Sequence, residues 1–114
     1  MRKIIKIISS EQIMVFNVDD TELNEQFIKK NIGRSDGTSY FERVNFYDYR
    51  DINIICDEEG KLKGLKPSLY IPGDFIAGDC LIVSLEHIYD GETGWFGLTD
   101  EQFNKVIVWC FNNG

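Results

Sequence analysis

The apolar residues in the first third of the chain predict a β-hairpin followed by a helix. Residues 2–8 and 12–18 are rich in β-branched side chains, and a short polar stretch separates them. Over about residues 21–32, apolar side chains recur at helical spacing and define one face: Leu23, Phe27, Ile28 and Ile32. Asp19 or Thr21 is expected to cap this helix, because either side chain can accept from the free amides of its first turn.

The middle of the chain predicts two further strands and an acidic turn. Residues 39–47 alternate between two partly apolar faces, and residues 52–56 form a short apolar run. The segment 57–60 has the composition of a turn, with Gly60 as the residue free to adopt a positive φ. Residues 61–65 alternate lysine with leucine, so we expect them to return as a partner strand.

The last third predicts one buried strand and a closing helix. Residues 79–85 are the best candidate for a buried strand, whereas prolines and glycines predict a loop or short 3₁₀ segment over 66–78. Residues 86–98 combine three glycines with the adjacent aromatic residues Trp95 and Phe96 and are expected to form a loop. Thr99 and Gln102 have the spacing of a capping box, which predicts a helix through about residue 111.

These elements predict an α+β fold. Its sheet is expected to be curled and mostly antiparallel, with about five or six strands and two helices packed on it. A chain of 114 residues is long enough for one hydrophobic core. We therefore expect residues 1–114 to form a single domain.

Charge and cysteine content narrow the range of functions. Nineteen acidic residues against twelve basic ones give a formal net charge of −7, which disfavours direct binding of nucleic acid. The three cysteines form no CxxC pair, and the single histidine completes no zinc pattern, so we expect no metal and no cofactor. The first residues predict neither a signal peptide nor a membrane span, which favours a cytoplasmic protein without a membrane partner.

Three motifs follow one another in the second half of the chain. They are Cys-Asp-Glu-Glu-Gly-Lys-Leu at 56–62, Gly-Asp-Phe-Ile-Ala-Gly at 73–78 with Leu-Ile-Val at 81–83, and Leu-Thr-Asp-Glu-Gln at 98–102. This order resembles a family of small domains of unknown function found in bacteria, phages and conjugative elements. Asp57 stands where members of that family usually carry Asn. The resemblance implies a mobile-element origin and an accessory role in the cytosol of a host bacterium, and it transfers no catalytic residues.

The sequence therefore favours a protein that acts by binding and not by catalysis. No serine lies in a nucleophile elbow, and His87 has no evident catalytic partner. We expect a phage- or mobile-element accessory protein that binds a host protein and inhibits a defence system of the CRISPR or restriction type. The candidate contact residues lie in the acidic turn and in the aromatic loop: Asp57, Glu58, Glu59, Lys61, Trp95 and Phe96. Each segment also has a purely structural interpretation, as a hairpin turn and as a loop folded onto the sheet.

Two alternative functions and one possible assembly state stay open. A small-molecule binding protein that sequesters a nucleotide signal would use cationic and aromatic side chains: Tyr40, Phe41, Arg43, Lys61 and Lys63, with Trp95 for stacking. A metal-dependent enzyme is a third class. A homodimer formed through a free strand edge is compatible with any of these functions.

Overall fold

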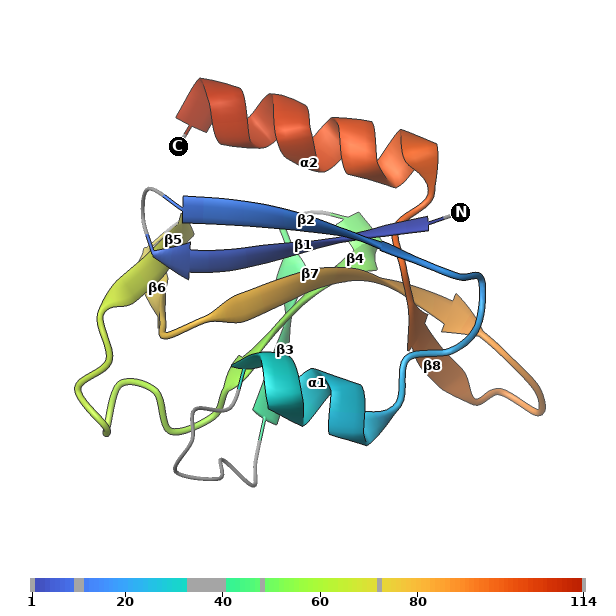
Figure 1. Ribbon diagram of the computed structural model, residues 1–114, viewed down its shortest axis with the longest axis horizontal. Helices are drawn as coiled ribbons and strands as arrows, with labels where there is room; N and C mark the ends of the chain where they lie inside the picture. Colours follow the sequence, from blue (N-terminus) through green and yellow to red (C-terminus); the bar gives the residue numbers. More distant parts are fainter. Residues whose placement is uncertain (1, 10–11, 33–40, 48, 72, 114) are drawn as a thin grey trace.

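The computed structural model describes residues 2–9, 12–32, 41–47, 49–71 and 73–113. The main sheet is six-stranded and consists of β1 (Arg2–Ser9), β2 (Gln12–Val18), β3 (Phe41–Phe46), β4 (Tyr49–Asp57), β7 (Cys80–His87) and β8 (Thr93–Phe96). A separate two-stranded sheet contains β5 (Pro67–Ile71) and β6 (Asp74–Ala77). The helices are α1 (Glu25–Ile32) and α2 (Asp100–Asn113). The predicted α+β architecture, with two helices on a mostly antiparallel sheet, is confirmed (Figure 1).

Strand β7 is the centre of the main sheet, whose order is β2-β1-β7-β4-β3. β4 pairs with β7 along residues 80–84. β1 pairs with residues 80–82 of β7, and β8 pairs with residues 84–87. Because a strand has two edges, β1 and β8 lie one after the other along the same edge of β7. The sheet is therefore divided at this edge, and β2 and β3 are left as its two outer strands.

Each face of the sheet carries one helix and one apolar core. Successive residues of a strand point to opposite faces, so Ile54 and Ile82 belong to one core while Ile55 and Leu81 belong to the other. The first core is covered by α2 through Val106, and the second is covered by α1 through buried isoleucines. Figure 1 shows the two helices on opposite sides of the sheet.

Local capping fixes where the helices begin. The capping box at α2 is confirmed: the Gln102 amide donates to Thr99 Oγ1 at 3.2 Å, and the Thr99 amide donates to Gln102 Oε1 at 2.9 Å. The capping prediction for α1 is wrong. Asn24 is the cap, because its Oδ1 accepts from the Phe27 amide at 2.8 Å, whereas Asp19 accepts from Thr21 in a separate turn. The helix consequently starts at Glu25.

Two segments depart from the predicted strand pattern. Residues 61–65 do not form a strand, because the chain continues turning: the Lys63 amide donates to the Glu59 carbonyl at 2.9 Å. Gly60 does not adopt a positive φ, which occurs instead at Gly64. Gly60 is required for a different reason, since a Cβ there would collide with the backbone carbonyl of Ala77.

Both segments predicted as loops contain hairpins. Strands β5 and β6 pair within residues 66–78, and β8 returns along β7 within residues 86–98. Strand β4 begins at Tyr49, three residues before the apolar run 52–56 from which it was predicted. The structure is therefore richer in strand than the sequence pattern suggests.

Candidate functional site

The acidic turn after β4 is held together by its own charged side chains. Asp57 is buried, and its Oδ2 receives a hydrogen bond from Lys63 Nζ at 2.8 Å. Its Oδ1 accepts from the Glu59 amide at 2.9 Å, which closes the turn as an Asx turn. Asp57 and Lys63 thus stabilise the turn, while Glu58 and Glu59 remain exposed.

Lys61 connects this turn to the β5–β6 hairpin. Its ammonium group bonds the carboxylate of Asp74 and lies 4.7 Å from the ring centroid of Phe75. The hydrogen bond from Lys61 lowers the pKa of the Asp74 carboxyl below its ordinary value. A hollow of about 280 Å³ lies between the turn and the hairpin. The part of the chain that the structure describes contains no group of three His, Cys, Asp or Glu side chains that could hold a metal ion.

The thiol nearest this hollow is not activated. Cys56 is buried, and desolvation, reinforced by the nearby Glu42 carboxylate, raises its pKa to about 12. Its Sγ lies 3.9 Å from Glu42 Oε1. A thiol with such a pKa stays protonated near neutral pH, so Cys56 is unsuited to nucleophilic chemistry.

Trp95 and Phe96 do not form one surface. They are successive residues of β8, so their side chains point to opposite faces of the sheet. Trp95 packs against the core beneath α1, and the guanidinium of Arg2 lies 5.6 Å from the ring centroid of Phe96. Neither side chain lines the hollow beside the acidic turn. The six predicted contact residues are consequently distributed over separate parts of the surface.

Trp95 lines a groove that the alternative set of residues partly shares. This groove, of about 420 Å³, lies between α1 and the sheet, and Phe41 and Arg43 also line it. The rings of Phe41 and Trp95 meet edge to face with centroids 5.7 Å apart. Lys61 and Lys63 belong to the turn described above, and Tyr40 lies outside the described residues. The structure thus brings together two of the five predicted ligand-binding residues, with Trp95 beside them.

Two residues that line this groove, Trp95 and Arg43, donate hydrogen bonds to a buried residue that sequence reasoning missed. Asn53 is fully buried on β4, and its Oδ1 accepts from Trp95 Nε1 at 3.1 Å and from Arg43 Nη1 at 3.4 Å. Its Nδ2 donates to Asn45 Oδ1 at 3.3 Å. Two carboxylates also line the groove, those of Glu22 and Glu25, so its polar lining carries both signs of charge. The only sequence feature that points to Asn53 is that it is a polar residue within the apolar run 52–56.

A second missed feature is the turn between β7 and β8. We call residues 88–92 the acidic tip, since Tyr89 and Ile88 are exposed there beside Asp90 and Glu92. Tyr89 is 79% exposed. Backbone hydrogen bonds between Ile88 and Glu92 (2.9 Å) and between Glu92 and Tyr89 (2.7 Å) fix the turn. The Asp90-Gly91 pair was its sequence signal, because both residues adopt a positive φ.

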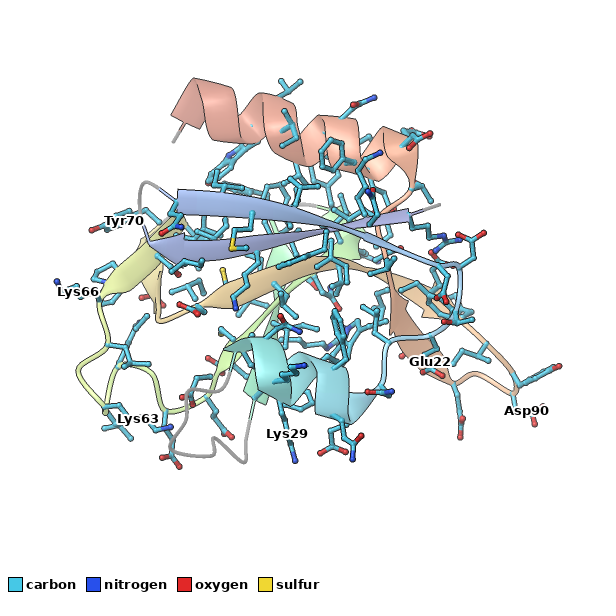
Figure 2. All side chains as sticks on the ribbon, in the orientation of Figure 1. Glu22, Lys29, Lys63, Lys66, Tyr70 and Asp90 are labelled. Carbon is cyan, nitrogen blue, oxygen red and sulfur yellow. The ribbon has the colours of Figure 1, made fainter. Side chains whose placement is uncertain are left out.

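The acidic tip also receives a carboxylate from the segment that precedes α1. Glu22 and Ile88 both lie against Gly94, which places the Glu22 carboxylate next to the tip. Figure 2 shows Glu22 and Asp90 at one end of the molecule and Lys63 and Lys66 at the other. The end that carries Lys63 also holds the exposed Glu58 and Glu59 of the acidic turn, so it carries both signs of charge.

The described residues thus form a small α+β structure with a mostly antiparallel sheet, an acidic tip and a groove of mixed charge between α1 and the sheet. The chain belongs to the domain family DUF3846, a domain of unknown function, whose sequence profile matches residues 12–110. The expected membership in a family of unknown function is thus confirmed. No curated protein and no solved structure matches the chain. Among the described residues, no helix is both long enough and apolar enough to span a membrane.

Proposed function

We propose that this protein is a non-enzymatic accessory protein of phage or other mobile-element type, which binds a host protein and inhibits a defence system of the CRISPR or restriction type. The acidic tip is the observation that carries this proposal. It presents an exposed tyrosine on a turn fixed by its own backbone, which limits the entropy lost on binding. The origin and the cytosolic setting rest on the family resemblance.

The chemistry of the tip favours a basic partner. Tyrosine is among the residues that most often dominate the binding energy of protein interfaces. The tip that exposes Tyr89 also carries the exposed Asp90 and Glu92, and the Glu22 carboxylate lies near its Ile88 side chain. Proteins that bind nucleic acid expose basic surfaces for the phosphate backbone. A nucleic-acid-binding face of a defence enzyme is therefore the kind of surface that the tip complements.

Substitution of Tyr89 by alanine is expected to weaken capture of the host partner by about tenfold or more. Tyr70 provides a matched control, because it is 61% exposed and Figure 2 places it at the end opposite Asp90. Affinity capture from host lysate should yield one stoichiometric basic protein with the natural chain and with Tyr70→Ala. Raised salt should weaken this capture, because the surrounding contacts are charged. Equal recovery with both variants, or no partner above background, would contradict the proposal.

A second candidate function is sequestration of a small molecule such as a nucleotide signal. The meeting of Phe41, Arg43 and Trp95 in one groove favours it, since aromatic rings stack on bases and a guanidinium binds phosphate. The Glu22 and Glu25 carboxylates oppose an anionic ligand in the same groove. The groove therefore supports this function less strongly than the tip supports protein binding.

Thermal unfolding across a panel of nucleotides tests this second candidate. A ligand at a hundred times its dissociation constant adds about 2.7 kcal/mol of stability, which corresponds to a rise in Tm of about 10 °C for a domain of this size. The rise should be lost in Arg43→Gln and retained in Lys66→Gln, whose side chain lies outside the groove. Unchanged melting curves across the panel would remove this candidate.

A further inference from the structure

The two outer strands of the main sheet differ in how they are protected. Natural sheets usually carry charged side chains on exposed edge strands, because an uncharged edge can pair with another chain. The outer strand β3 carries Glu42 and Arg43, both exposed. The other outer strand, β2, has no charged side chain over residues 12–18. This strand is therefore an unprotected edge.

Strand β2 exposes apolar side chains on both faces of the sheet. Ile13 and Val15 are each 46% exposed and Met14 is 37% exposed. Ile13 and Val15 pair with Ile7 and Ile5 of β1, so they extend the apolar face that α2 covers. Met14 points to the opposite face. An incoming strand would thus cover apolar side chains on either side of the sheet.

We propose that β2 pairs antiparallel with β2 of a second copy of this chain, with Met14 opposite Met14 of that copy. In this register Ile13 faces Val15 of the second copy, and the same pair recurs on the other side of the twofold axis. That register also places Gln12 opposite Phe16. Centring the pair on Val15 would oppose Met14 to Phe16 but place the exposed Ile13 opposite Asn17 twice. The register centred on Met14 is favoured because it opposes each of the exposed apolar residues Ile13, Met14 and Val15 to another apolar residue.

The distribution of charge is compatible with a second copy. Each chain has a net charge of −7, so two copies repel unless their acidic parts stay apart. No charged residue lies between Gln12 and Val18, so no two carboxylates are opposed along the paired strands. The acidic tip lies on the other side of β1, at the turn between β7 and β8. The paired strands would extend each sheet into one continuous sheet and leave both tips accessible.

Cysteine cross-linking tests the register directly. In a chain with Cys110→Ser, the other native cysteines are Cys56 and Cys80, and both are buried. Met14→Cys should form a disulfide-linked dimer under mild oxidation, because directly opposed residues have the spacing that a disulfide needs. In this register Val15 of one copy lies two positions along the strand from Val15 of the other copy. Val15→Cys should therefore remain monomeric on a non-reducing gel. Cross-linking at Val15 and not at Met14 would overturn the proposal.

Mass measurement by light scattering tests the dimer itself. The natural chain should elute at twice its mass of 13.2 kDa, and Val15→Lys should elute at the single mass with an unchanged circular dichroism spectrum. Leu62→Lys is the matched control, since Leu62 is 88% exposed but belongs to the turn after β4 and not to β2, and this variant should stay dimeric. A monomeric natural chain, or a dimer that survives Val15→Lys, would exclude pairing through β2.

Discussion

Replacement of Ile82 by alanine is expected to lower the free energy of unfolding by about 2–5 kcal/mol. Ile82 lies in β7, where it pairs with Ile5 of β1 on one side and with Ile54 of β4 on the other. All three side chains are completely buried in the core beneath α2. Truncation would remove packing from the one strand that joins both halves of the sheet.

Urea unfolding measures this effect, with Leu62→Ala as the control. Leu62 is the same kind of aliphatic residue but is largely exposed, so its truncation should change stability by no more than about 0.5 kcal/mol. The m-values of both variants should match that of the natural chain, because the surface exposed on unfolding is unchanged. A loss below 1 kcal/mol at Ile82 would mean that β7 is not the central strand.

The elements that could be predicted from sequence are those fixed by local signals. The hairpin of β1 and β2, the buried strand β7 and the capping box of α2 each depend on neighbouring residues. The β7–β8 hairpin was predicted as a loop although Asp90-Gly91 is a strong hairpin signal between two apolar runs. The three glycines in the same segment favour a loop and so mask that signal. Pro72-Gly73 is a comparable signal between β5 and β6.

The candidate site could be predicted only in part, because its contacts join strands far apart in the sequence. Trp95 bonds Asn53 across the sheet, a contact that requires β8 and β4 to flank β7. No pattern within β8 reveals that order. The acidic turn illustrates the converse case. Its composition is typical of a binding segment, yet the Asp57 carboxylate accepts hydrogen bonds from Lys63 and from the backbone of the turn. Composition alone does not separate these two uses.

Replacement of Gly60 by alanine is expected to destabilise the protein by about 3 kcal/mol, at the upper end of the usual cost of overpacking. The new Cβ would collide with the Ala77 carbonyl oxygen and lie 3.2 Å from its carbonyl carbon. Backbone atoms cannot rotate away as a side chain can. The turn is also fixed on both sides, because Gly60 donates to the Asp57 carbonyl at 3.1 Å and accepts from the Leu65 amide at 3.1 Å.

Gly64 provides the matched comparison, since it lies in the same turn and has a φ of +70° with open space around its Cα. Alanine there should cost only about 1 kcal/mol, because the left-handed strain is partly offset by the lower entropy of the unfolded chain. Thermal and urea unfolding of the two variants should therefore rank Gly60→Ala well below Gly64→Ala in stability. The opposite ranking would mean that conformational freedom, and not the close approach of β6, is what requires glycine in this turn.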